Sequence, residues 1–274
     1  GGVVLERYGE RMTCDRLECL VESAGKDEAG YRFIKASGHV VRTAERQTLK
    51  GDSAVFMTKE QTVEVNGQVE LLEPNYRGVA HYLFHEIKLN QTRLEGVDGL
   101  PVQLHVVAAN GDISDITGDH VVVQRTADGK QSTVNVESHA TYTSDKGRLT
   151  AQKIKAEAVK EKEGVLTADG TVKGLVDGVS FEAGHATWNR ASGELELTQQ
   201  PKLKDAQEIA VTGERIWSDS KRRQMIVYST PDHLATVYLP AEEKGAPGLA
   251  HAQKIYVTDE GNSTEIDMTG QVHY

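Results

Sequence analysis

One strand pattern recurs six times along the sequence, with an apolar residue at every second position and a glycine at a constant place. In the copy around Gly67 the intervening residues Glu64, Asn66, Gln68 and Glu70 are polar. This period of two residues is typical of a strand with one buried and one wet face. The chain is therefore predicted to be a repeat protein of β-hairpins. The clear copies are Ile34-Ala36-Gly38-Val40, Val63-Val65-Gly67-Val69, Leu166-Ala168-Gly170-Val172 and Ile266-Met268-Gly270-Val272, and weaker copies are Ser114-Ile116-Gly118-His120 and Ile209-Val211-Gly213-Arg215.

A second short element precedes several of the glycine strands, so each pair of strands with its turn forms one hairpin-sized unit. Glycine inside a strand is less stable than alanine by about 0.5–1 kcal/mol, so its return in one phase predicts a bulge, a bend or a close backbone approach. The preceding elements are Cys14-Asp15-Arg16-Leu17, Gly51-Asp52-Ser53-Ala54, Ala151-Gln152-Lys153-Ile154 and Ala252-Gln253-Lys254-Ile255.

These patterns predict an all-β chain with more than half of its residues in strands and no helix longer than about three turns. The charge-rich stretch 153–163 is predicted as strand, because its verbatim partner at 252 continues into Tyr256-Val257-Thr258. Repeats fill residues 1–78 and 101–274, which we expect to be continuous with each other, and 79–100 is expected to be an irregular connection.

Composition excludes several classes of function. The formal charge of -10, with basic residues scattered, argues against nucleic acid as a partner. No apolar run reaches the roughly 18 residues of a membrane helix. The start at Gly1-Gly2-Val3 lacks an initiator Met and leaves room for a signal or an anchor ahead of it. Cys14 and Cys19 are five residues apart on one strand, too far for a disulfide unless a turn intervenes, and are expected to be free thiols.

No residue set makes a convincing metal or catalytic site. His81 and His85 have helical metal-pair spacing but lack a third ligand. The stretch 110–115 has the composition of a calcium loop without its spacing, and Asx turns explain the same residues better. Two glycan sequons, at Asn90 and Asn262, need a eukaryotic secretory context. Neither a nucleophile motif nor a phosphate loop occurs, so we expect no enzyme, no metal and no cofactor.

The apolar stripe has two interpretations. Its residues are the closed core of a sandwich, or they line an open trough whose natural ligand is an acyl chain. On either interpretation we expect Glu64, Gln68 and Glu70 to face solvent. The residues expected to line the interior and to contact lipid are Ile34, Val40, Val63, Val65, Val69, Leu71, Leu166, Val172, Ile209, Val211, Ile266, Met268 and Val272.

The alternation of strand, polar turn and glycine strand, together with Phe181-Glu182-Ala183-Gly184-His185-Ala186-Thr187-Trp188 leading into Ser192-Gly193-Glu194-Leu195-Glu196-Leu197, resembles the OstA-like family of lipopolysaccharide-transport proteins. That family comprises the periplasmic LptA, the periplasmic part of LptC and the N-terminal domain of LptD. The resemblance covers nearly the whole chain apart from about 76–100, although the chain exceeds one typical family domain and has His120 and Arg215 where clear repeats have Val.

The resemblance implies an elongated β-jelly-roll of stacked, V-shaped antiparallel hairpins in the periplasm, with lipid A acyl chains passing along the interior. It also implies end-to-end strand pairing with like-folded partners and no catalytic residue. The alternatives are a carbohydrate-active β-solenoid or jelly-roll enzyme, for which only Trp188 and Trp217 offer tryptophan platforms, and a structural cell-envelope scaffold with a closed core.

Overall fold

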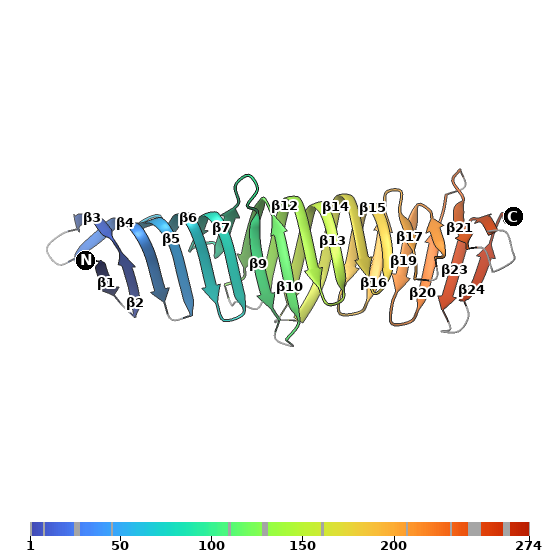
Figure 1. The fold of residues 1–274 in the computed structure, drawn as a ribbon, viewed down its shortest axis with the longest axis horizontal. Coiled ribbons are helices and arrows are strands. Elements are labelled where there is room, and N and C mark those ends of the chain that lie inside the picture. The colour runs from blue at the N-terminus through green and yellow to red at the C-terminus, as the bar shows by residue number, and fades with distance from the viewer. Residues whose placement is uncertain are drawn as a thin grey trace. The chain divides into compact units, whose positions relative to one another are not determined.

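A computed structural model describes residues 2–7, 9–24, 28–44, 46–108, 111–127, 131–159, 162–206, 208–230, 232–240, 248–259 and 264–273. The fold is all-β, with 77% strand and no helix in the described part of the chain (Figure 1). The predicted strand content is confirmed, including β-structure at 153–159 in place of a helix. Within the described ranges, no helix has the length and apolarity to cross a membrane.

The chain divides into two compact units: unit 1 is Gly1–Ser138 with Val159–Glu161, and unit 2 is His139–Ala158 with Lys162–Tyr274. The boundary falls inside one strand, β12, rather than in the stretch 79–100. The strands of unit 1 are β1 (Val3–Arg7), β2 (Glu10–Cys14), β3 (Arg16–Ala24), β4 (Glu28–Ala44), β5 (Gln47–Met57), β6 (Thr62–Glu73), β7 (Tyr76–Glu86), β8 (Gln91–Glu95), β9 (Val102–Val107), β10 (Ile113–Gly118), β11 (His120–Arg125) and the first part of β12 (Gln131–Ser144).

Unit 2 holds the remainder of β12 and twelve further strands. These are β13 (Gly147–Val159), β14 (Lys162–Val176), β15 (Val179–Asn189), β16 (Glu194–Thr198), β17 (Lys202–Lys204), β18 (Ala210–Thr212), β19 (Arg215–Asp219), β20 (Gln224–Tyr228), β21 (Ala235–Leu239), β22 (Gly248–Ala252), β23 (Lys254–Asp259) and β24 (Thr264–Thr269).

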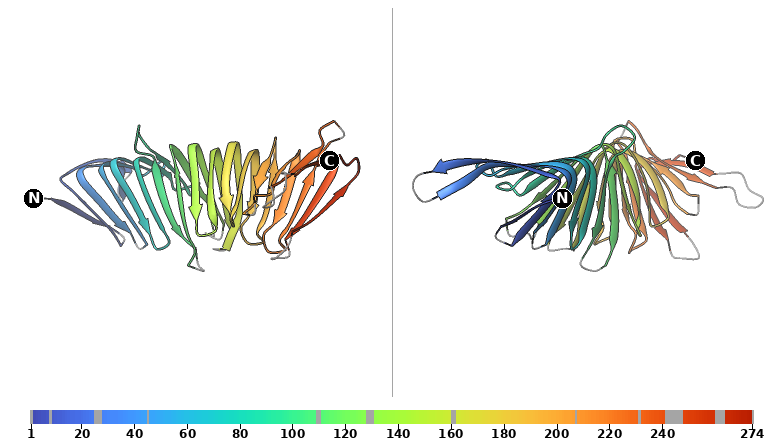
Figure 2. Two further views of the ribbon diagram at one scale, coloured as in Figure 1. Left: turned by 45° about the vertical axis from the view of Figure 1, so that its right-hand side comes forward. Right: turned by 60° about the vertical axis from the view of Figure 1, so that its left-hand side comes forward.

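The long strands of unit 1 each belong to two rows of hydrogen-bonded strands (Figure 2). β7 shows this directly: its residues 82–86 pair with β8, and its residues 76–79 pair with β9. Row A is formed by β8, β11 and one half of each long strand: 33–37 of β4, 53–57 of β5, 62–66 of β6 and 82–86 of β7. Row B is formed by β2, β9, β10 and the other half of each long strand: 40–44 of β4, 47–51 of β5, 69–73 of β6 and 76–80 of β7. The rows face each other, because a Cβ added at Gly78 in row B would lie 3.5 Å from Leu94 Cδ1 in row A.

The repeated glycines lie where a strand passes from one row to the other. The pairing shifts register between Ser37 and Val40, between Asn66 and Val69, and between Asp169 and Val172, so each glycine strand carries one additional residue there. Gly67 has φ +95°, in the left-handed region that favours glycine. The predicted bulge is therefore confirmed at these three strands.

Unit 2 also has two rows, which we call C and D. The strand β15 pairs through His185–Asn189 with β16 and through Ser180–Glu182 with β17. Row C continues through β19, β20, β23 and β24, and row D continues through β18, β21 and β22. Beyond β15 the two rows are built from separate short strands.

Most of the apolar stripe is buried as predicted. The buried members are Val40, Val63, Val65, Val69, Leu71, Leu166, Val172, Ile209 and Val211. The prediction of burial is wrong for Ile266, Met268 and Val272, which stay half-exposed, because β24 pairs on one side only and Val272 lies beyond its end. Ile34 is half-buried as well.

The polar phase also differs in detail from the prediction. Gln68 is exposed, whereas Glu64 and Glu70 are half-buried on the outer face. Glu64 accepts a hydrogen bond of 2.9 Å from the Tyr82 hydroxyl, and Glu70 pairs with Lys50 and Arg77 at 2.8 and 2.9 Å. Side chains of neighbouring strands on the solvent-facing side therefore cover these carboxylates, and the register of the strand is as predicted.

Two local predictions are also decided by the structure. The stretch 79–100 is not an irregular connection throughout, because it contains most of β7 and all of β8. Cys14 and Cys19 are free, as predicted, with Cys14 buried and Cys19 exposed.

Candidate functional site

A group of polar side chains points between the two rows of unit 1, at the strand ends remote from the glycine bulges. Directly paired residues of antiparallel strands share a face. Arg42 pairs with the buried residues Met12 and Leu49, and Glu73 pairs with the buried Tyr76. The strand phase therefore puts these side chains on the inner face. We call the set the mouth cluster; it comprises Arg42, Gln47, Glu73, Tyr76, His85 and Arg125.

An ion pair joins the two rows within this cluster. Arg125, at the end of β11 in row A, meets Glu73, at the end of β6 in row B. Two guanidinium nitrogens of Arg125 contact the two carboxylate oxygens at 3.1 and 2.7 Å, and Gln47 Nε2 donates to Glu73 Oε1 at 3.1 Å. The Glu73 side chain is 16% exposed and that of Arg125 is 31% exposed. A two-point contact of this kind fixes the orientation of both groups.

Arg42 makes a second link across the mouth. Its guanidinium donates to Glu10 at 2.7 and 3.2 Å and to Gln47 at 3.4 Å. The same guanidinium lies 5.8 Å from the centre of the Phe56 ring, on the row A part of β5. Arg42 in row B therefore contacts an aromatic side chain of row A.

Tyr76 lies beneath Arg125, whose guanidinium carbon is 5.5 Å from the ring centre. The hydroxyl is buried, and no described residue lies within hydrogen-bonding distance of it. Burial raises the pKa of this hydroxyl, so it remains a donor at all physiological pH values. A buried donor without an acceptor is destabilising, which makes the position unusual for a packed core.

His85 borders the cluster on the row A side. It pairs with the buried Val63 in the register of β6 and β7, and its Nδ1 lies 2.9 Å from Thr92 Oγ1. Burial, followed by the positive charge of Arg125, lowers the pKa of His85. The imidazole is therefore neutral at pH 7, and the cations of the mouth cluster are the two arginines.

The sequence-predicted lipid residues lie deeper than the mouth cluster and form two separate groups. Val40, Val63, Val65, Val69 and Leu71 fill the interior of unit 1, while Leu166, Val172, Ile209 and Val211 fill that of unit 2. The interior is packed at these positions, since Val65 is 1% exposed and Val211 is 0% exposed. Ile34, Ile266, Met268 and Val272 are not gathered with them in the buried core.

Unit 2 has a related arginine cap. The rings of Tyr142 and Trp188 meet edge to face, with centroids 6.1 Å apart and planes at 83°. Arg190 donates to the Tyr142 hydroxyl at 2.6 Å and lies 5.4 Å from its ring centre. The Trp188 indole N–H is buried, and no described group accepts its hydrogen bond.

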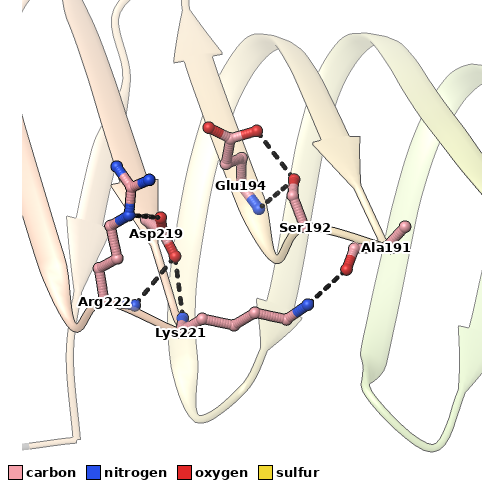
Figure 3. A network of polar contacts seen from close by, with 6 residues as sticks. All are labelled: Ala191, Ser192, Glu194, Asp219, Lys221 and Arg222. Carbon is pink, nitrogen blue, oxygen red and sulfur yellow. Dashed lines mark hydrogen bonds and ion pairs between the residues drawn. The ribbon is translucent and has the colours of Figure 1, made fainter.

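Figure 3 shows two adjacent turns of unit 2 that a lysine side chain links. Asp219 Oδ1 accepts from the backbone N–H groups of Lys221 and Arg222 at 2.9 and 3.0 Å, and Lys221 Nζ reaches the Ala191 carbonyl of the neighbouring turn at 2.5 Å. In that neighbouring turn Ser192 Oγ donates to Glu194 at 2.8 Å. These contacts hold the two turns in place.

The mouth cluster was missed in the sequence, although a signal for it existed. Counting by two from Leu71 leads to Glu73, and counting by two from Val123 leads to Arg125. When the alternation of inward-facing residues reaches a charged residue at the end of a strand, that residue lies at the opening between the rows. A charged residue in a strand pattern usually indicates the solvent-facing side, so the pattern alone does not distinguish these two residues from surface charges.

The other candidates gain little from the structure. His81 is exposed and His85 half-buried on the strand β7, where four residues span about 13 Å, so they cannot share one ion. Asn110 and Asn262 lie outside the described residues, and Asn90 Nδ2 donates to the Thr126 carbonyl at 3.3 Å. Among the described residues, no group of three or more metal-ligating side chains occurs.

No protein-family model matches the sequence, and no curated protein matches it at a significant level.

Proposed function

We propose that the chain is a non-enzymatic lipid-binding protein of the OstA-like lipopolysaccharide-transport type, which holds acyl chains between its two rows of strands. The observation that supports this most is the polarity of the inner face in unit 1. It is apolar from the glycine bulges through Val69 and Leu71 and becomes polar at Glu73 and Arg42. This gradient matches that of an acylated lipid, with its chains inside and its polar part outside.

The proposed partners are lipopolysaccharide or a similar acylated lipid and like-folded proteins in the periplasm. Strand edges support the second kind of partner. In the described pairings of unit 1, β1 bonds only to β2 and β3 only to β4, and in unit 2 β24 bonds only to β23. An edge strand carries unpaired backbone groups that accept a further strand, so end-to-end pairing is the mode of assembly that we propose.

Photo-crosslinking in cells that make lipopolysaccharide tests the proposal. Probes at Val65 and Val69 sample the interior of unit 1, and probes at Ile266 and Met268 sample the end of unit 2. Probes at Glu64 and Gln68 on the outer face are the matched controls. We expect lipid adducts from the interior probes alone. Equal labelling of both faces, or no labelling from the interior of a folded protein, would exclude the binding of acyl chains between the rows.

A closed structural scaffold is the second candidate, and the packed interior at Val65 and Val211 favours it. A scaffold predicts no interior adducts and no lipid-dependent shift in thermal unfolding. The carbohydrate-active alternative loses one of its two tryptophan platforms, because Trp188 is buried against Tyr142.

A further inference from the structure

We propose that the mouth cluster of unit 1 is a subsite for the head group of an anionic acylated lipid, with Arg125 and Arg42 binding the phosphate or carboxylate and the Tyr76 hydroxyl donating to the carbonyl oxygen of the acyl linkage. This inference rests on the proposed lipid-binding function. It adds which part of the ligand lies at which residues.

The order of polarity across the inner face supports this assignment. Along β6 the inward residues run from Glu73 at the mouth to Leu71 and Val69 at the bulge. Tyr76 is paired with Glu73 in the register and stacks beneath Arg125, and its ring reaches toward the level of Leu71, because a Cβ added at Gly78, the partner of Leu71, would lie 3.5 Å from Tyr76 Cε1. An acylated lipid has the same order of parts: a charged head, a carbonyl linkage and a hydrocarbon chain. Each part of the ligand thus meets side chains of matching chemistry.

The two arginines suit an anion that arrives from outside. Placing cations on the inner face is unfavourable unless each has an anionic partner. Glu73 now provides that partner for Arg125, through a planar two-point contact that a phosphate or carboxylate reproduces. Binding of the head group would exchange one oxyanion for another on the same guanidinium, and the half-exposed edge of the cluster gives Glu73 access to water.

Tyr76 provides the independent observation. Its hydroxyl is buried and has no acceptor among the described residues, although a buried hydroxyl usually finds one. The ring that carries this hydroxyl stacks on Arg125 of the ion pair, whose guanidinium carbon lies 5.5 Å from the ring centre. An acyl carbonyl oxygen is an acceptor without charge, which suits this depth below the guanidinium.

Binding of three soluble probes to the whole chain tests the assignment by calorimetry below their critical micelle concentrations. Dodecyl phosphate has an anionic head, dodecyl maltoside has a neutral head on the same chain, and lauroyl lysophosphatidate adds a carbonyl. We expect the wild type to bind dodecyl phosphate about tenfold or more tightly than dodecyl maltoside, with a preference that weakens as salt rises. Inorganic phosphate alone should not compete at equal concentration, because the chain supplies much of the affinity.

The variant Arg125→Gln should remove the preference for the phosphate probe and leave maltoside binding within about twofold. The matched control is Arg93→Gln, because Arg93 is an outward arginine of the neighbouring strand that stacks on Phe84 at 5.9 Å. That control should keep the full preference. Arg125→Gln leaves the Glu73 carboxylate without its cation, which could unfold the protein. In that case the double variant Arg125→Gln with Glu73→Gln replaces it in the binding measurement.

Tyr76→Phe tests the carbonyl contact separately. It should weaken lauroyl lysophosphatidate by about threefold to tenfold and leave dodecyl phosphate unchanged. An equal loss for both probes, or none for either, would overturn the role of Tyr76.

The results for the wild type distinguish the head-group subsite from lipid binding as a whole. If both heads bind equally and Arg125→Gln has no effect, the head-group subsite is wrong while lipid binding stands. If none of the probes binds, the proposed function itself fails, and the mouth cluster is a structural contact between the rows. Competition by inorganic phosphate as strong as by dodecyl phosphate would identify a free-anion site instead.

Discussion

The carboxylate of Asp52 lies directly against the α-carbon of Gly67, so a Cβ added to this glycine would overlap Oδ2, Cγ and Cβ of Asp52. The arrangement recurs: Asp15 lies against Gly38, Gln152 against Gly170 at 2.5 Å from such a Cβ, and Gln253 against Gly270. The glycine strand and the Asp or Gln element that precedes it in the sequence therefore contact each other at these four glycines, whereas Gly118 and Gly213 face Val136 and Val227.

Gly67→Ala is expected to destabilise unit 1 by about 2–4 kcal/mol, because left-handed backbone and the overlap with Asp52 add together. Gly99→Ala separates the two causes, since Gly99 has φ +78° but open space around it, and should lose only about 1–2 kcal/mol. Urea unfolding measures both. Equal losses at the two sites, or no partial rescue of Gly67→Ala by Asp52→Gly, would contradict the contact.

Asp219→Ala should destabilise unit 2 by about 1–2 kcal/mol, because two backbone N–H groups of the turn lose their acceptor (Figure 3). Asp219→Asn keeps that acceptor and should cost less than about 0.5 kcal/mol. The neighbouring turn already uses an asparagine in this way, with Asn189 Oδ1 accepting from Ala191 and Ser192 at 3.1 Å each. Thermal unfolding of the two variants measures these losses of stability. A larger loss for Asp219→Asn than for Asp219→Ala would refute the role of Asp219 as the acceptor of the turn.

Alkylation should distinguish the two thiols. Cys14 is buried, and burial raises the pKa of its thiol, whereas Cys19 is exposed. Because the thiolate is the nucleophile, iodoacetamide at pH 7.5 should label Cys19 at least about tenfold faster than Cys14 in the folded protein. Peptide mass spectrometry gives the two rates. Similar rates in the native state, compared with a urea-unfolded control, would show that β2 opens.

The stability of unit 1 should fall as pH falls below about 6.5, the usual pKa of histidine. Burial lowers the pKa of His85 in the folded protein, so between 6.5 and that lower value the unfolded chain takes up a proton that the folded chain does not. The contribution of His85 is complete above pH 6.5 and is lost as pH approaches the folded pKa. The variant His85→Gln should make the urea midpoint less dependent on pH in this range. The variant His81→Gln is the control, because it removes an exposed histidine.

The strands and their inner faces could be predicted because both signals are local. Alternation around Gly67 assigns Val63, Val65 and Val69 to one face, and glycine in a strand marks the bulge. The half-exposed state of Met268 could not be predicted, because it depends on what lies beyond β24 rather than on the sequence of β24. The stretch 79–100 lacks the repeat pattern, which predicted an irregular connection, yet most of β7 and all of β8 lie in it.

The mouth cluster could be predicted only in part. The phase of Glu73 and Arg125 was readable, but their pairing joins residues 52 positions apart on different rows. Such a contact depends on how the rows face each other, which no local pattern encodes. Tyr76 was unremarkable as a strand residue, and its lack of an acceptor among the described residues becomes visible only when its neighbours are placed.

The continuity of β15 has a mechanical consequence for unit 2. At β14 and β15 one unbroken backbone runs through both rows, so separating the rows there requires bending covalently continuous, hydrogen-bonded strands. From β16 onward the rows are joined by short segments such as 199–201 and 213–214, which are held by fewer hydrogen bonds than a paired strand: the Gln199 carbonyl accepts from Gly184 N–H, and Glu214 N–H donates to the Tyr228 carbonyl, both at 2.9 Å. Unit 2 is therefore stiff at the β15 end and compliant toward β23. A force applied across its rows would open it from the compliant end first.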